Sequence, residues 1–181
     1  YTRERQQGMT ITIVGGAYRE VCISPELDQF YGSGGRAAAA LSTHDNIEFH
    51  TYASINAKRH LRNLASRYPI TIYQRPARQM ISFEYDHALL RPRIRPPVSK
   101  ITNERPINIK GEVILLFGML EGRGQISGKS VVYDPQSEQN PARFRSGGNK
   151  AARLGIVLNQ AELQGLTGIT DLKNGTLQLM R

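Results

Sequence analysis

The residues best placed to do chemistry follow two short apolar stretches in the second half of the chain. Residues 131–133 precede Asp134, and residues 156–158 precede Asn159, with Glu162 three positions later. Short β-branched runs predict buried strands, and ligands of open α/β sheets bind beyond the carboxyl ends of strands. Asp134, Asn159 and Glu162 are therefore candidates to organise water and Mg²⁺ near a phosphate, because Mg²⁺ prefers oxygen ligands.

The Asn159-x-x-Glu162 pattern also has a purely structural interpretation. An Asn at the start of a helix with Glu three residues later is typical of a capping box, in which each side chain accepts a hydrogen bond from a free backbone N–H. The two interpretations are compatible, because a capping carboxylate can still present an oxygen to solvent.

A glycine-rich segment opens a predicted alanine-rich helix in the first half. Gly32, Gly34 and Gly35 precede residues 36–41, RAAAAL. Such glycines let a polar or anionic ligand lie against backbone N–H groups at a helix N-terminus. A turn that leads into a helix explains them equally well.

Two other motifs are excluded by their spacing. Gly128-Lys129-Ser130 resembles part of a P-loop, but that motif needs a glycine where this chain has Arg123, and it must run into a helix rather than a strand. The four histidines have no metal-ligand spacing with one another or with Cys22, which argues against a zinc site.

Composition predicts one α/β domain in a chain of 181 residues. The formal charge of +9 favours either an anionic partner or a solvated basic surface. Cys22 is the only cysteine, as is typical of a reducing, cytoplasmic compartment. No apolar stretch reaches the roughly 20 residues of a membrane span, so no membrane partner is expected. Residues 1–8 are polar and are interpreted as an upstream extension or an expression remnant.

Hydrophobic patterning predicts alternating strands and helices with no internal repeat. Helices are predicted over residues 36–41, from Ser54 through Ala65, and over residues 160–166, with Gly168 ending the last one. Basic residues 91–97 and polar residues 138–150 are predicted loops. Strands are predicted over residues 9–14, 47–53, 70–73, 80–85, 113–117, 131–133 and 156–158. The strand–helix–strand order favours parallel pairing.

The order of these segments resembles that of the ribokinase-like (PfkB) carbohydrate and nucleoside kinases from Met9 to Gly168. The most specific match is residues 156–168, IVLNQAELQGLTG. Supporting matches are the first strand with Gly15-Gly16, the Gly34-Gly35-Arg36 signature, and VVYDP at residues 131–135.

The resemblance implies a three-layer sandwich with a mostly parallel central sheet plus a small β lid from residues around 17–33 and 70–97. It implies an incomplete domain over residues 9–181 whose C-terminal part is missing. It further implies ATP- and Mg²⁺-dependent phosphoryl transfer to a sugar or nucleoside, and a possible homodimer through the lid. Glu20, Gly34 and Gly35 would bind substrate, and the predicted metal and phosphate ligands would be Asp134, Asn159 and Glu162.

Three departures from the family pattern affect the expected activity. Glu20 stands where the family has Asp, and residues 37–40 are alanines where the family has an Asn. No Gly-x-Gly-Asp, the family's catalytic base and anion hole, occurs in the chain, so no catalytic residue is assigned. This chain alone is therefore not expected to catalyse the transfer, and it is expected to be part of a longer protein.

Two other functions remain open. A non-catalytic relative that binds a ligand or partner would explain the altered substrate positions and the missing base. A nucleic-acid-binding role would rest on the net charge and on Arg91, Arg93 and Arg95. It ranks last, because no recognition element with interleaved aromatic residues is present.

Overall fold

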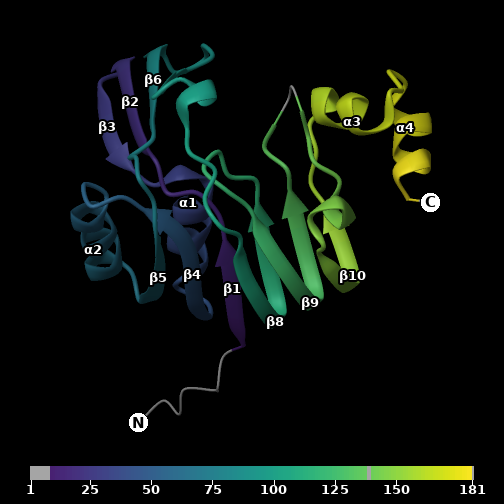
Figure 1. Cartoon of the computed structure of the whole chain (residues 1–181), viewed down its shortest axis with the longest axis horizontal. Helices are drawn as coiled ribbons and strands as arrows, with labels where there is room; N and C mark the ends of the chain where they lie inside the picture. Colours follow the sequence, from purple (N-terminus) through teal and green to yellow (C-terminus); the bar gives the residue numbers. More distant parts are fainter. Residues whose placement is uncertain (1–8, 138–139, 181) are drawn as a thin grey trace.

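The computed structural model describes residues 9–137 and 140–180, so the predicted extension over residues 1–8 lies outside the described part. Its centre is a six-stranded sheet in the order β10-β9-β8-β1-β4-β5, in which every neighbouring pair is parallel (Figure 1). The strands are β1 (Thr10–Val14), β4 (Asn46–Ala53), β5 (Ile70–Pro76), β8 (Ile107–Phe117), β9 (Gly124–Asp134) and β10 (Lys150–Ile156). The predicted mostly parallel α/β fold is confirmed.

A second, four-stranded sheet lies beyond the carboxyl ends of these strands, at the upper left of Figure 1. It has the order β3-β2-β6-β7 and contains β2 (Arg19–Ser24), β3 (Leu27–Phe30), β6 (Ser82–His87) and β7 (Arg93–Arg95). Its strands come from the two segments predicted to form the lid, except that β5 belongs to the large sheet. The predicted loop over residues 91–97 was wrong at β7, which pairs antiparallel with β6.

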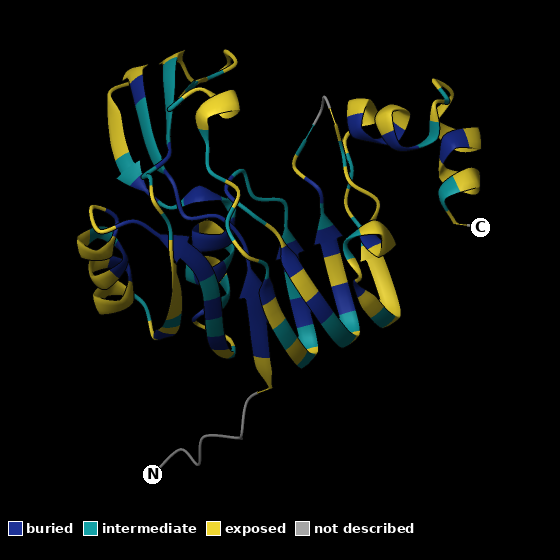
Figure 2. Ribbon diagram, in the orientation of Figure 1, coloured by how far each residue is buried: buried dark blue, intermediate teal, exposed yellow. Residues whose placement is uncertain are grey.

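Two helices cover one face of the large sheet. Helices α1 (Gly32–Leu41) and α2 (Lys58–Arg67) contact β4 and β5, and the side chains of Ile13, Phe49 and Leu61 are fully buried between them. Figure 2 shows the buried inner surface of this layer and the exposed outer face of α2. The basic side chains of α2 thus lie on its solvated face, as its amphipathic pattern predicts.

Strands β8 and β9 cannot be straight. They pair in parallel over eleven residues each, with Ile107 opposite Gly124 and Phe117 opposite Asp134. A straight strand of this length spans about 33 Å, whereas residues 118–123 can bridge at most ~25 Å. A Cβ on Gly124 would lie 2.5 Å from Leu116 Cδ1, near the far end of β8. Each strand therefore folds back on itself at mid-length.

The corner of each bent strand is a glycine followed by a charged residue. Gly111 pairs with Gly128, and next to them the Lys129 ammonium lies 3.3 Å from the Glu112 carboxylate. Along β9, the buried residues have even numbers before the corner, as at Ile126, and odd numbers after it, as at Val131. β8 and β9 thus share one bent shape in which their corner glycines pair, and the absence of an internal repeat stays a prediction.

This bend builds the layer on the second face of the sheet. The first limbs, residues 107–110 and 124–127, pack on Val14, Ile114 and Leu116 in a second core cluster. The cluster takes the place of a helix layer over this part of the sheet. Gly128-Lys129 is one of its corners and opens no helix, so the structure confirms that the segment is not a P-loop.

The chain after β9 differs in detail from the predicted pattern. The predicted strand over residues 156–158 was placed too late, since β10 ends at Ile156, and a short 3₁₀ turn, Phe144–Gly147, lies in the predicted loop. Helix α3 (Gln160–Thr167) is confirmed, with Gly168 as its left-handed C-cap at φ 74°. Helix α4 (Leu172–Leu179) was not predicted. No helix in the described part is long and apolar enough to cross a bilayer.

Ser54 does not cap α2 directly. Its hydroxyl accepts a hydrogen bond of 3.3 Å from the Ala57 N–H, which closes a turn just before the helix begins at Lys58. The predicted start of this helix was therefore several residues early.

Gly34 and Gly35 allow a matched test of packing within one helix. A Cβ on Gly34 would lie 2.7 Å from Phe49 Cε2 and 3.0 Å from the Gly15 backbone, whereas the nearest atom to a Cβ on Gly35 is Leu64 Cδ2 at 3.5 Å. Gly34→Ala is expected to lower the free energy of unfolding by about 1–3 kcal/mol through overpacking.

Gly35→Ala is the control and is expected to be neutral or to stabilise by up to about 1 kcal/mol, because alanine favours a helix. Urea denaturation of both variants measures the difference. Equal effects of the two substitutions would contradict this packing.

Candidate functional site at the carboxyl edge of the large sheet

Asp134, Asn159 and Glu162 come together at one end of the large sheet, as their positions after two strands predict. Strands β9 and β10 are parallel neighbours, and the Val157 N–H extends their pairing by donating to the Tyr133 carbonyl at 2.9 Å. Asp134 ends β9, and Asn159 and Glu162 open α3. The three side chains line one cavity of about 470 Å³, here called the acidic pocket.

Glu162 is a buried clamp between two segments. One carboxylate oxygen accepts a 3.0 Å bond from the Asn159 N–H, and the Asn159 side chain accepts from the Glu162 N–H at 2.9 Å. The second carboxylate oxygen accepts from the Ser137 N–H at 2.8 Å. The predicted capping box is confirmed, and the third bond fastens the loop after β9 to the start of α3.

Asp134 holds the same loop in a tight turn. Its two oxygens accept bonds from the Gln136 backbone N–H at 3.1 Å and from the Gln136 side chain at 3.2 Å. Gln136 takes a left-handed backbone conformation with φ 51°. Gly118 donates to the Asp134 carbonyl at 2.8 Å, and a Cβ on Gly118 would lie 1.9 Å from the Pro135 carbonyl oxygen. The loops after β8 and β9 are therefore locked together.

The acidic pocket contains no closed metal cage among the described residues. Within residues 9–137 and 140–180, no three His, Cys, Asp or Glu side chains are grouped to bind a metal. Both oxygens of each carboxylate that lines the pocket, and the Asn159 side-chain oxygen, already accept hydrogen bonds within the protein. Mg²⁺ typically keeps several waters and binds one or two carboxylates together with substrate phosphates.

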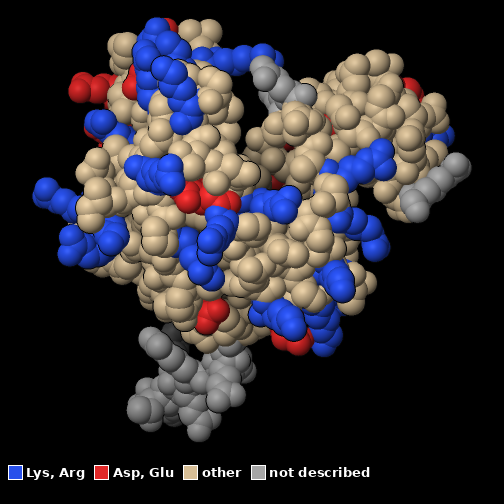
Figure 3. Space-filling view, in the orientation of Figure 1, with Lys and Arg blue, Asp and Glu red and all other residues tan. Residues whose placement is uncertain are grey.

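A second cavity, here called the edge pocket, lies between the small sheet and the carboxyl edge. It has a volume of about 380 Å³ and shares Gln136 with the acidic pocket. Phe83 and Ile94 line it from the small sheet, and Tyr18 lines it from the chain after β1. Figure 3 shows the surface hollowed between the small sheet and helices α3 and α4. The two pockets are thus neighbours on one edge.

A buried Tyr–Glu pair supports the floor of the edge pocket. The Tyr18 hydroxyl donates to the Glu121 carboxylate at 2.7 Å and accepts from the Leu120 N–H at 3.1 Å. The Tyr18 ring also packs against Phe83, with 5.3 Å between ring centres. Burial raises the pKa of the Glu121 carboxyl above its usual value and the pKa of Tyr18 well above its own.

The residues predicted to bind substrate lie outside both pockets. Glu20 is in β2, where it accepts from the Gln29 side chain at 2.8 Å and forms an ion pair with Arg36 of α1. Gly34 and Gly35 are buried against neighbouring side chains. None of the three lines the edge pocket or the acidic pocket. Their predicted role in substrate binding stays a prediction.

The edge pocket itself was not predicted. Its walls come from segments that are distant in the sequence, including Tyr18, Phe83, Ile94, Arg123 and Arg143. Tyr18, Phe83 and Ile94 fall within the two segments predicted to form the lid, whereas Arg123 and Arg143 were not linked to any site. No motif spacing could relate the other residues, because the topology of the sheet alone brings them together.

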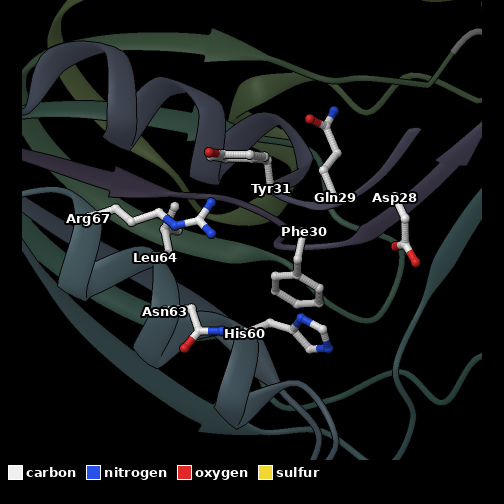
Figure 4. Close-up of a pocket in the computed structure, with 8 residues that line it drawn as sticks. All are labelled: Asp28, Gln29, Phe30, Tyr31, His60, Asn63, Leu64 and Arg67. Atoms are coloured by element: carbon white, nitrogen blue, oxygen red, sulfur yellow. The ribbon is translucent and has the colours of Figure 1, made fainter. Parts of the chain in front are cut away.

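A third cavity of about 290 Å³ lies between β3 and α2 (Figure 4). The His60 ring stacks on Phe30 with 4.9 Å between ring centres, and Asn63 and Arg67 line the pocket from the same helix. It contains none of the predicted site residues and shares no residue with the other two pockets.

The clamp role of Glu162 predicts a specific loss of stability. Glu162→Gln replaces one accepting oxygen by an amide donor, so either the Ser137 or the Asn159 N–H loses its partner. We expect the free energy of unfolding to fall by about 1–3 kcal/mol in urea denaturation. Glu112→Gln, which alters only the exposed pair with Lys129, is expected to change it by less than about 1 kcal/mol. Similar values for both variants would contradict the clamp.

The raised pKa of Glu121 predicts a pH effect. Folding favours the protonated carboxyl, so this group contributes stability below its ordinary pKa of 4.5 and loses it as the pH rises through the folded value. Glu121→Gln keeps an acceptor for Tyr18 but cannot ionise. We expect urea denaturation to show a smaller loss of stability between acid and neutral pH for this variant. Glu26→Gln, at an exposed position, is the control, and identical profiles for all three proteins would refute the assignment.

Comparisons with known proteins identify the fold. No family model and no curated protein matches the sequence. A pyrophosphate-dependent kinase in the ribokinase family, solved with a pyrophosphate analogue and myo-inositol, aligns with a TM-score of 0.61 at 13% identity over 94% of this chain and 68% of its own. The sulfate complex of a pyrophosphate-dependent kinase in that family aligns with a TM-score of 0.57 at 12% identity, over 94% and 69%.

A third structure is of a pyrophosphate-dependent myo-inositol-1 kinase that mutation converted into a myo-inositol-3 kinase. It aligns with a TM-score of 0.53 at 13% identity, over 94% of this chain and 66% of its own. The chain thus spans about two thirds of the length of these structures. Together with the parallel sheet and the small second sheet, these alignments show that the chain has a ribokinase-like fold.

Proposed function

We propose that this chain forms the acceptor-binding and metal-binding part of a kinase that transfers a phosphoryl group to a hydroxyl of a sugar or nucleoside. One observation supports this most directly: the edge pocket and the acidic pocket adjoin at Gln136 on the carboxyl edge of a ribokinase-like fold. An acceptor in the first pocket and a phosphate donor at the second would meet at that residue.

The arrangement suits the physical requirements of phosphoryl transfer. The reaction depends mainly on positioning and on electrostatic stabilisation of the transferred group. Phe83 and Ile94 of the small sheet cover the acceptor side and would exclude water, which otherwise competes for the phosphoryl group. Asp134, Asn159 and Glu162 would orient the waters of a Mg²⁺ ion bound to the donor phosphates.

The donor is either ATP, as the family resemblance implies, or pyrophosphate. Three of the aligned structures are described as pyrophosphate-dependent enzymes or variants of one, which supports pyrophosphate as a donor to test beside ATP. Because the sequence contains no Gly-x-Gly-Asp, we propose no catalytic base within it. Turnover is proposed only for an assembly that supplies such a base.

The alternative is a non-catalytic ligand-binding protein with the same fold. The ion pair between Glu20 and Arg36 favours it, because the carboxylate at the family's substrate-binding position is engaged within the protein. A homodimer through the small sheet and a cytoplasmic location remain proposals of the same kind.

Calorimetry with and without MgCl₂ tests the proposed donor site. We expect Mg²⁺ to be required for binding of ATP or pyrophosphate, and Asp134→Asn to weaken that binding roughly tenfold to a hundredfold, as loss of a carboxylate around a metal does. Binding of acceptors such as myo-inositol, ribose or adenosine is expected to be unchanged. Asp28→Asn, which alters an exposed ion pair with Arg19 outside the edge and acidic pockets, is the matched control.

The outcomes separate the two functions. Equal donor affinity in the Asp134 variant and the parent would refute the donor site. Failure of every acceptor to bind would refute the acceptor pocket. Acceptor binding with no donor binding would favour the non-catalytic alternative, and phosphoryl transfer to any acceptor would exclude it.

A further inference from the structure

We infer that the acceptor carries a phosphate group, and that Arg123 and Arg143 bind it in the edge pocket. The inference rests on the proposed function and specifies its substrate class: a sugar or nucleoside that already bears one phosphate, in place of a neutral one. It rests on the charges that line the pocket, on the anchoring of the two arginines, and on the apolar wall opposite.

The charged residues that line the edge pocket are all basic. Among its described lining residues, Arg123 and Arg143 are the only charged ones, and no Asp or Glu is present. Neutral sugars are recognised through hydroxyl groups, which donate well to carboxylates. A guanidinium has no acceptor and instead matches the oxygens of a phosphate with two parallel N–H groups. Among its described lining residues, the pocket thus offers groups that match a phosphate and no carboxylate to accept from a hydroxyl.

Arg123 is fixed at its backbone and available at its side chain. Its carbonyl accepts from the Ile107 N–H at 3.0 Å, and the buried Tyr52 hydroxyl, which donates to the Arg105 carbonyl at 2.7 Å, lies 3.3 Å from the same Arg123 carbonyl. The guanidinium makes no hydrogen bond or ion pair to the described residues that would occupy it. A fixed base with an unengaged charged end suits a residue that binds a ligand.

Arg143 approaches the pocket from a different loop and is anchored at its tip. One Nη donates to the Leu166 carbonyl in the last turn of α3 at 2.9 Å, and Leu166 lines a neighbouring cavity that Arg143 also lines, so Arg143 lies between that cavity and the edge pocket. The neutral carbonyl does not cancel its charge. Two guanidinium groups from two separate segments, one after β8 and one after β9, therefore contribute positive charge to one cavity.

The opposite wall is apolar. Phe83 and Ile94 of the small sheet and Phe117 at the end of β8 line the pocket together with the Tyr18 ring. A sugar ring presents C–H groups that pack on such surfaces, while its phosphate reaches the arginines.

Calorimetry with paired ligands tests the inference. The probes are myo-inositol with myo-inositol 1-phosphate, ribose with ribose 5-phosphate, and inorganic phosphate and pyrophosphate alone. We expect at least one phosphorylated compound to bind about tenfold or more tightly than its neutral partner at low salt. Arg123→Gln and Arg143→Gln are each expected to remove roughly tenfold to a hundredfold of that affinity.

Arg145→Gln is the matched control. It makes the same change in net charge two residues from Arg143, but Arg145 lines other cavities and not the edge pocket. We expect it to keep the full preference for the phosphorylated ligand. An equal loss in all three variants would indicate a general effect of net charge and would overturn the inference. Arg123 is exposed at its side chain, so its variant stays informative even where the Arg143 variant is unstable.

The remaining outcomes distinguish this inference from the proposed function. Neutral and phosphorylated forms that bind equally, with no effect of either arginine, would overturn the inference and leave the kinase proposal standing. No binding of any sugar or nucleoside would refute the proposed function itself. If inorganic phosphate or pyrophosphate binds as tightly as the sugar phosphate and needs the same arginines, these residues serve the donor, and the acceptor assignment is wrong.

Discussion

The bend in β8 and β9 is the constraint on which the candidate site depends. Parallel neighbours normally need a crossover of a dozen residues or more, usually a helix. Here the first limb of each strand is itself the crossover, so residues 118–123 suffice to join them. Both strands therefore begin and end at the carboxyl edge, and each contributes two segments to it. Arg123 and Gly118 lie at that edge for this reason, although they come from a short connection.

The same constraint explains why the glycines of this region matter. Gly111 and Gly128 form the corners, and a Cβ on Gly128 would lie 2.7 Å from Val131 Cγ2 and 3.1 Å from Ile114 Cδ1. The limbs must approach the sheet closely because a layer of extended chain is thinner than a helix. Gly118 serves the other end in the same way, since its N–H donates to the Asp134 carbonyl and a Cβ there would meet the Pro135 carbonyl oxygen. Close contacts between backbone segments, more than side chains, thus determine the shape of the edge pocket at this end of the sheet.

The sequence predicted the parts of the molecule that follow from local patterns. The buried strands, the cap at Asn159 and the approach of Asp134 to Glu162 all follow from short-range rules. The limb over residues 107–110 did not, because four residues that alternate Ile with polar side chains cannot be told from a loop. The bend in β8 and β9 was not predicted, because a corner glycine and a change in the buried positions form no recognisable sequence pattern. The edge pocket depends on pairing between distant strands, which local patterns do not encode.

Glu162 and Glu20 are both predicted ligand-binding residues, but the structure gives their carboxylates different surroundings. Glu162 is a structural clamp that still lies in a cavity, so its capping role and a role near phosphate are compatible. Glu20 is different, because its carboxylate pairs with Arg36 and joins the small sheet to α1. A carboxylate neutralised in this way is a poor acceptor for a substrate hydroxyl, since the guanidinium competes for the same lone pairs. Under the proposed function, recognition of the acceptor rests on other groups, and the charged residues in the described lining of the edge pocket are Arg123 and Arg143.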